Sequence, residues 1–234
     1  MFLKDDRGNE VQEILSKIKE EIEANEGNKN MSQSQKAYLV LNEAIQKLIL
    51  KPGTPLFEND FSEYLNMSRT PIREAIHRLE NDGLVVKRKG KGAFVKTYNR
   101  ENVRQIYEIV EALESQASFL AANRYENEDL RELEQSVNKM IEAKKKEKFS
   151  LWIEGDQKFH NTLPYLCNNP KFVEASESLY GQINLFRMTY LDTNGIDSKS
   201  VEEHKKTFEA IKNQKGEIAR KVTFHHWQRI RKQT

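Results

Sequence analysis

Residues 68–76, which read SRTPIREAI, restrict the fold of this chain more than any other stretch. Pro71 suits the first position of a helix, where its missing N–H costs nothing, and Thr70 before it can cap that helix. We therefore predict a helix with Arg73 on its exposed face and with Arg69 and Thr70 projecting from its amino-terminal end. The apolar residues that follow recur at helical spacing and predict one buried face: Ile72, Ala75, Ile76 and Leu79.

A helix that buries one face and leads with arginine and threonine suits the major groove of DNA. Thr70 and the two arginines can donate to phosphate oxygens, and arginine can also grip the edge of a guanine with two hydrogen bonds. Taken alone, however, the nine residues fit an ordinary capped surface helix better. The surrounding sequence has to decide between these two interpretations.

The residues around this helix predict a winged helix-turn-helix domain. Apolar periodicity predicts helices over 33–50 and 58–65 before the arginine-bearing helix. Two β-rich runs, at 84–86 and 93–95, then flank a basic, glycine-containing turn at 87–92. Four cations in that turn would lie well against a phosphate backbone, and its glycines allow a close approach. This order of elements favours DNA contact over a simple solvated turn.

Charge and composition fit a DNA-binding module followed by a second domain. Of the 234 residues, 37% are hydrophobic and 32% are charged, and the net charge is +2. Residues 35–98 hold 11 basic and 7 acidic side chains, so the positive excess lies in the predicted winged domain. No apolar run reaches membrane-spanning length, and the charged amino terminus has no secretory signal. Cys167 is the only cysteine, which excludes an internal disulfide framework and a cysteine-based zinc site, so we expect a cytoplasmic protein.

The predicted domains are an extension at 1–34, the winged domain at 35–98 and a helical domain at 99–234. The extension contains one helical pattern, which predicts either a short packed helix or a polar extension. No period of 20–50 residues repeats beyond Asn99, so we expect a bundle, and a mainly α protein. The six helices expected in that bundle are 101–123, 127–147, 150–167, 171–191, 198–213 and 216–231. The first of them should bury Val103, Ile106, Ile109, Val110, Leu113 and Ala117.

Asp156 and His160 lie one helical turn apart in the third helix of this bundle. Two ligands at that spacing can hold one metal ion, although a complete site needs more ligands. Further histidines lie in the same domain, His204 two helices later and His225 and His226 near the chain end. The alternative is a plain carboxylate–imidazole pair, and the residues alone favour that alternative.

The winged domain resembles the amino-terminal domain of the GntR family of bacterial transcription regulators. The resemblance rests on Pro52-Gly53, Leu56, Glu58, SRTPIREAI at 68–76, Arg78-Leu79-Glu80, Gly83-Leu84-Val85 and GKGAFV at 90–95. Ser62 and Asn66 depart from the family's usual Ala and Gly. The resemblance implies double-stranded operator DNA as the partner. The residues expected to contact it are Ser68, Arg69, Thr70 and Arg73 of the helix and Lys89, Gly90, Lys91 and Gly92 of the wing tip.

Residues 101–230 resemble the all-helical FCD domain of the FadR-type branch of that family, in its shorter, VanR-like form with six helices. The resemblance rests on IYEIVEALE at 106–114, DQKFH at 156–160, Asn169, EEH at 202–204 and the spacing from Ala219 to His226. Many such domains bind a divalent metal through one Asp and three His. The resemblance implies Asp156, His160, His204 and His226 as ligands, with Zn²⁺ suited best and Ni²⁺ or Mn²⁺ as alternatives.

The resemblance also implies a homodimer that reads two half-sites, and a small effector such as an organic acid bound at or near the metal. The family often has an arginine where this chain has Val110, so Arg187 becomes the candidate for carboxylate recognition. The effector would release repression or, alternatively, promote activation. Two rival functions are a regulator for which the metal itself is the signal, and a metal-dependent hydrolase fused to a DNA-binding module. We favour a regulator with no catalytic residue and no membrane partner.

Overall fold

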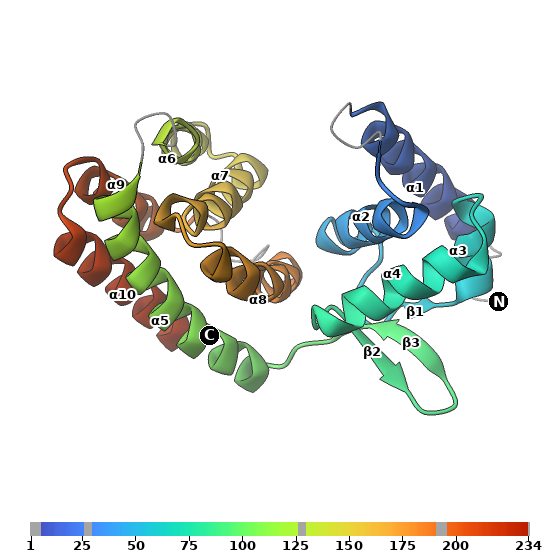
Figure 1. The fold of residues 1–234 in the computed structure, drawn as a ribbon. Helices are drawn as coiled ribbons and strands as arrows, with labels where there is room; N and C mark the ends of the chain where they lie inside the picture. The colour runs from blue at the N-terminus through green and yellow to red at the C-terminus, as the bar shows by residue number, and fades with distance from the viewer. Residues whose placement is uncertain (1–5, 26–29, 126–129, 191–195, 234) are drawn as a thin grey trace. The chain divides into compact units, whose positions relative to one another are not determined.

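The computed structural model of this chain divides into two compact units (Figure 1). The first unit spans Met1–Thr97 and the second spans Tyr98–Thr234. The first combines helices with a small sheet and the second is helical, so the predicted fold class is confirmed. The described residues are 6–25, 30–125, 130–190 and 196–233. The helix breaks predicted at 27–29, Asn127 and 194–195 lie outside them.

The first unit contains four helices and three short strands in its described part. They are α1 (Asp6–Ala24), α2 (Gln33–Gln46), β1 (Pro55–Leu56), α3 (Glu58–Tyr64), α4 (Arg69–Asn81), β2 (Val85–Arg88) and β3 (Gly92–Val95). The sheet order is β1-β3-β2, and β3 is antiparallel to both neighbours. The sequence did not predict β1, because a two-residue strand shows no alternation. Its pairing with β3 connects the segment before α3 to the wing.

Helix α4 begins two residues earlier than the sequence predicted. Ser68 is its N-cap and Arg69 its first residue, so Pro71 occupies the third position instead of the first. Proline is tolerated there because the first four N–H groups of a helix have no intrahelical partner. Pro71 also lacks the N–H that a capping side chain would bond, and the Ser68 side chain makes no capping hydrogen bond. The Ser68 hydroxyl is therefore exposed beside Thr70.

The wing is a hairpin with longer strands than the sequence predicted. β2 continues to Arg88 and β3 starts at Gly92, and these two residues pair directly across the hairpin. The turn therefore consists of residues 89–91. Gly90 and Gly92 have φ values of +72° and +93°, which a residue with a side chain adopts only under strain.

Two of the four cations predicted at the wing tip are held elsewhere. Lys87 and Arg88 lie within β2. Lys87 pairs with Glu80 of α4 at 2.6 Å, and the Arg88 guanidinium lies 4.6 Å from the ring centre of Phe94. Both residues lie in a strand and not in the turn, because β2 pairs with β3 over more residues than the apolar pattern suggested. The tip itself carries Lys89 and Lys91.

Helix α1 packs against α2 and α3, with Leu15, Ile18 and Ile22 buried. It also reaches the turn between α3 and α4, because Lys19 Nζ donates to the carbonyl oxygen of Leu65 at 2.7 Å.

The same turn uses both residues that depart from the family pattern. Asn66 has φ +48°, a left-handed conformation that asparagine tolerates. The Ser62 hydroxyl donates to the carbonyl oxygen of Met67 at 2.6 Å. Side chains from α1 and α3 thus hold the turn that precedes the arginine-bearing helix.

The second unit contains six α-helices and one short 3₁₀-helix among its described residues. They are α5 (Arg100–Arg124), α6 (Leu130–Lys146), α7 (Phe149–Thr162), η2 (Tyr165–Cys167), α8 (Pro170–Tyr190), α9 (Ser198–Lys212) and α10 (Gly216–Gln233). α10 packs along α5, and α6 packs along α7 (Figure 1). None of the described helices combines the length and the apolar character that crossing a lipid bilayer requires.

Two predictions for this unit were wrong in detail. The helix predicted at 150–167 is interrupted: α7 ends at Thr162, because Pro164 has no N–H to continue the hydrogen-bond ladder and its ring clashes with the carbonyl one turn earlier. Ile109 was predicted to be buried, but its side chain is 51% exposed while Val110 beside it is buried. The apolar stripe of α5 is therefore wider than the face that packs within this unit.

Gly155 permits the close packing of α7 on α6. A Cβ at this position would lie 2.8 Å from Met140 Cγ and 3.0 Å from the carbonyl oxygen of Ser136. Such contacts are too short, so any larger residue would separate the two helices. The close approach places the next residue, Asp156, in the core, where it is 1% exposed.

We predict that Lys19→Met lowers the stability of the first unit by about 1 kcal/mol, because the Leu65 carbonyl loses its donor. Both tryptophans lie in the second unit, so tryptophan fluorescence reports only that unit during urea unfolding. Far-ultraviolet circular dichroism should show an earlier transition while the fluorescence transition stays in place. Lys17→Met, which removes only an exposed pair with Glu13, is the control. Equal behaviour of the two variants would contradict the prediction.

Candidate functional site

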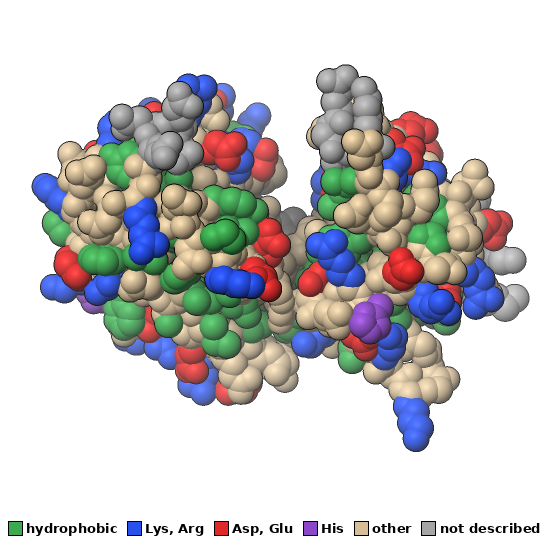
Figure 2. All heavy atoms as spheres, viewed as in Figure 1, with side chains coloured by type: hydrophobic (Ala, Val, Ile, Leu, Met, Phe, Trp, Pro, Cys, Tyr) green, Lys and Arg blue, Asp and Glu red, His purple; other side chains and the backbone are tan. Residues whose placement is uncertain are grey.

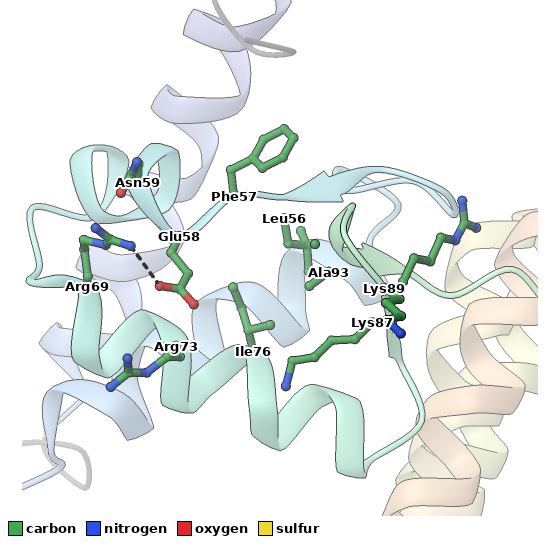
Figure 3. Close-up of a pocket in the computed structure, with 12 residues that line it drawn as sticks. Leu56, Phe57, Glu58, Asn59, Arg69, Arg73, Ile76, Lys87, Lys89 and Ala93 are labelled. Carbon is green, nitrogen blue, oxygen red and sulfur yellow. Dashed lines mark ion pairs between the residues drawn. The ribbon is translucent and has the colours of Figure 1, made fainter.

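A basic cavity of about 480 Å³ lies between α3, α4 and the sheet of the first unit (Figure 3). Its apolar floor comes from residues such as Leu56, Ile76 and Ala93. Five cations line it, from α4, β2 and the wing turn: Arg69, Arg73, Lys87, Arg88 and Lys89. The long, flexible cations are set on a rigid frame, which suits a polyanion more than a small apolar ligand.

The predicted DNA-contacting residues of α4 lie at or near its amino-terminal end. Ser68, Arg69, Thr70 and Arg73 are all exposed. Arg69 and Arg73 line the basic cavity, because they are one turn apart on the same face of α4. Ser68 and Thr70 instead line a neighbouring cavity together with Lys19 of α1.

The predicted wing residues divide in the same way. Lys89 and Gly92 line the basic cavity, whereas Gly90 and Lys91 are exposed at the turn. Figure 2 shows a positive side chain extending from the tip of this hairpin. The wing and α4 thus present cations along one continuous surface of the first unit.

The second site is a buried cluster of three histidines. His160 of α7, His204 of α9 and His226 of α10 each place a ring nitrogen within 4.8 Å of the others. The two closest nitrogens are His204 Nε2 and His160 Nε2, at 3.1 Å. His225 is exposed and does not join them, because it follows a different face of α10.

Asp156 completes the predicted set of four. Its Oδ2 lies 3.8 Å from His160 Nε2 and its Oδ1 lies 3.9 Å from His204 Nε2. The buried Arg187 donates to Oδ2, whereas Oδ1 is buried and has no hydrogen-bond partner. Burial alone would raise the pKa of Asp156, but Arg187 and the neighbouring histidines hold it below its usual value. The carboxylate is therefore charged, with one oxygen unsatisfied and directed toward the imidazoles.

Two glutamates that the sequence analysis did not predict orient the histidines. Glu114 Oε2 accepts from His160 Nδ1 at 2.8 Å, and Glu203 Oε2 accepts from His226 Nδ1 at 2.8 Å. A carboxylate only accepts, so Nδ1 carries the hydrogen in both rings and Nε2 is directed into the cluster. Arg229 holds Glu203 in turn, at 2.6 Å.

The sequence contained a signal for Glu114. Glu114 lies on the apolar stripe of α5, one turn after Val110 and one turn before Ser118, where a carboxylate needs a buried partner. Glu114 also accepts a hydrogen bond at 2.8 Å from Nε1 of Trp227, the residue that follows His226. Glu203, directly before His204, had no comparable signal, because exposed charged residues surround it in the sequence.

The surroundings hold the histidines in different states. Burial lowers the pKa of His204 well below its usual value, and His226 lowers it further. Burial likewise lowers the pKa of His226 more than Glu203 raises it. Burial would also lower the pKa of His160, but Glu114 reverses that effect and leaves the pKa raised. His204 and His226 are thus neutral near pH 7, the form that ligates metals.

The donor set fits a divalent cation. Three imidazoles and one carboxylate are suitable first-row metal ligands, and carboxylates on the far ring nitrogens are the usual second layer around metal-bound histidine. Three buried atoms around the cluster that can accept a hydrogen bond have no partner: Asp156 Oδ1, His204 Nδ1 and Glu114 Oε1. A cation would satisfy Oδ1, which otherwise lies in the core without a hydrogen-bond partner.

Two family descriptions match separate segments of this chain. Residues 33–95 match the family described as bacterial regulatory proteins, gntR family, and residues 105–229 match the FCD domain. This chain belongs to the GntR family of transcriptional regulators and carries an FCD domain. Helix α1 lies before both matched segments.

Relatives across the GntR family extend over most of the chain. The HTH-type transcriptional repressor RspR of Escherichia coli is 26% identical over 197 residues, covering 84% of this chain and 86% of RspR. The galactonate operon transcriptional repressor of the same bacterium is 26% identical over 190 residues, covering 72% of this chain and 82% of the repressor. The solved structure of E. coli McbR/YncC covers 87% of this chain and 98% of its own, with a TM-score of 0.74 and 23% identity, and shares the fold.

We predict that Glu114→Ala destabilises the second unit of this GntR-family regulator by roughly 3 kcal/mol, because two buried donors, on His160 and Trp227, lose their acceptor. Urea unfolding followed by tryptophan fluorescence measures the change. Glu101→Ala on the same helix removes an exposed carboxylate paired with Arg104 and should stay within about 0.5 kcal/mol of wild type. A Glu114 variant as stable as this control would show that the carboxylate does not hold the core.

Proposed function

We propose that this regulator reads a specific operator sequence in duplex DNA with α4 and the wing. One observation carries the proposal: arginines of α4 and cations of the wing line the same cavity. The turn between α3 and α4 is fixed by hydrogen bonds from Lys19 and Ser62. Helix-turn-helix proteins have the same order of elements and insert the second helix into the major groove. Arg69 and Arg73 would contact base edges and phosphates there. Ser68 and Thr70 would donate to phosphates of the DNA backbone. The wing residues Lys89, Gly90, Lys91 and Gly92 would contact the adjacent DNA backbone.

We predict different effects for two cations of this surface. Arg73→Ala should lower affinity for the operator by about 1–3 kcal/mol and relax base preference, because arginine grips a guanine edge bidentately. Lys91→Ala should weaken binding to all duplexes alike and reduce the salt slope by about 1. Fluorescence anisotropy with specific and scrambled duplexes at several salt concentrations measures both. If the wild-type protein binds scrambled duplexes as tightly as any other sequence, the operator-reading function is wrong.

A homodimer formed through the second unit is part of the proposal. Ile109 of α5 is half exposed, and Figure 2 shows apolar side chains gathered over α5 and α8 on the visible face of that unit. Burying such a face would remove apolar area from water. A two-fold dimer would present two equivalent recognition helices to the half-sites of a near-palindrome.

We propose that Asp156, His160, His204 and His226 hold a divalent metal, zinc first and nickel or manganese as alternatives. Glu114 and Glu203 support the proposal, since each keeps one histidine in the tautomer that offers Nε2 to the cluster. The metal, when bound, would supply a Lewis-acidic position for a carboxylate effector. The name of the galactonate operon repressor fits this chemistry, because galactonate is a carboxylate.

Arg187 is the proposed second contact for such an effector. Its guanidinium is buried next to Trp152 and donates to Asp156 through one nitrogen. A guanidinium has five N–H donors in a fixed fork, a geometry that matches a carboxylate. An effector held by Arg187 would sit directly beside the histidines.

Helix α5 is the proposed route from this site to DNA. Glu114 connects it to His160 and Trp227, and its first residue follows the N-cap Asn99 at the start of the second unit. An effector that prefers one arrangement of this core would therefore bias α5, and operator affinity would change by the same coupling free energy. Release of repression is the expected direction.

We predict that the purified protein retains a divalent metal, which His204→Ala abolishes and His225→Ala preserves, because only His204 faces the cluster. Native mass spectrometry with elemental analysis reports the ion, its stoichiometry, a co-purified ligand and the dimer together. Equal metal content in both variants would contradict the assignment. If metal alone changes operator affinity without any organic acid, the metal is the signal.

A further inference from the structure

Glu58 is the one carboxylate among the residues that line the basic cavity. It lies in the first turn of α3 and pairs with Arg69 of α4, with Glu58 Oε2 and Arg69 Nη2 3.5 Å apart. Figure 3 shows the two side chains directed toward each other, with Arg73 on the next turn of α4. An acidic group therefore stands on the surface where the proposed function needs positive charge.

A carboxylate in the first turn of α3 is favourable for that helix, but helix stability does not require its pair with Arg69. The Glu58 side chain is 32% exposed and that of Arg69 is 67% exposed. Exposed pairs with such geometry add little to stability, because both groups are well solvated when apart. The pair also opposes binding to any duplex, since Glu58 neutralises a cation that could otherwise contact a phosphate. A role in discrimination between sequences accounts for both facts.

We propose that Glu58 is a specificity-determining residue that reads a G·C base pair together with Arg69. In the major groove, guanine offers two acceptors, which arginine grips, and cytosine offers its 4-amino donor, which a carboxylate accepts. The amino group of cytosine lies next to O6 of guanine in the same pair. Because the Arg69 guanidinium and the Glu58 carboxylate are in contact, the first can bind the guanine and the second the cytosine of one base pair.

The same contact penalises other sequences. Thymine presents an oxygen acceptor where cytosine has its amino donor, so a T·A pair would face Glu58 with like polarity. A duplex without the matching pair also leaves Arg69 partly neutralised and thus weakens its phosphate contacts. The inference rests on the proposed DNA-reading function and assigns one base pair of the operator to one pair of side chains.

The first experiment measures base preference with intact protein. Duplexes selected by the wild-type protein from a random pool define the operator, and each G·C pair in it is then replaced by A·T. At one position per half-site, the replacement should cost wild type about 5- to 100-fold in affinity but cost Glu58→Ala much less. Glu63→Ala, which removes an exposed carboxylate from the same helix outside the cavity, should keep the wild-type profile.

The second experiment separates base reading from charge. On a scrambled duplex, Glu58→Ala and Glu58→Gln should both bind more tightly than wild type, with salt slopes steeper by about 0.9, because Arg69 gains a phosphate. On the operator, Glu58→Gln should keep the preference for G·C, since its amide oxygen still accepts from cytosine. Circular dichroism confirms that each variant is folded.

Two outcomes would overturn the inference. If wild type selects an operator and Glu58→Ala keeps the same base profile, Glu58 reads no base. If Glu58→Ala and Glu63→Ala change the salt slope equally, the change comes from the loss of any negative charge and not from the pair between Glu58 and Arg69. A wild-type protein that selects no sequence at all removes the proposed function itself, and this result is distinct from both.

Discussion

The second unit depends on one buried carboxylate. Glu114 accepts from His160 of α7 and from Trp227 of α10, while its own helix α5 begins next to the boundary with the DNA-binding unit. Removing a charge from water costs several kcal/mol, and two charge-assisted hydrogen bonds offset much of that cost only in this arrangement. The carboxylate therefore connects α5 to α7 and α10 and sets which nitrogen of His160 faces the cluster.

The DNA-binding unit follows a different logic, because its important side chains are exposed. Their positions come from the backbone. Pro71 leaves the Ser68 side chain without a capping hydrogen bond, and Asn66 turns the chain before α4. Lys19 of α1 stabilises that turn. Charge in this unit is partly balanced within the surface itself, by Glu80 on Lys87 and by Glu58 on Arg69. A surface balanced in this way has less general affinity for phosphate and more to gain from the correct base sequence.

Much of the fold was predictable because it depends on local patterns. Helical periodicity, prolines and glycines placed the helices of both units within a few residues, and Pro164 explains the one predicted helix that is interrupted. The histidines His160, His204 and His226 were named through resemblance to the FCD domain, since spacing alone relates only Asp156 to His160. Glu114 was missed although its place on the apolar stripe of α5 was a signal, and Glu203 was missed because nothing in the sequence distinguishes it from the exposed charges around it. The expected burial of Ile109 failed for a related reason: periodicity shows that a face is apolar, but not what covers it.

The sequence by itself determined the order of elements, the basic winged module and the membership of the GntR family, because these depend on residue type and spacing along the chain. Tertiary structure decided which of the cations at 87–91 remain at the wing tip, since strand pairing and the contacts with Glu80 and Phe94 draw two of them back. It also decided that Asp156 and three histidines from three helices meet, and that Arg187 joins them. Such contacts join residues far apart in the chain, so their free energy appears only when the helices pack.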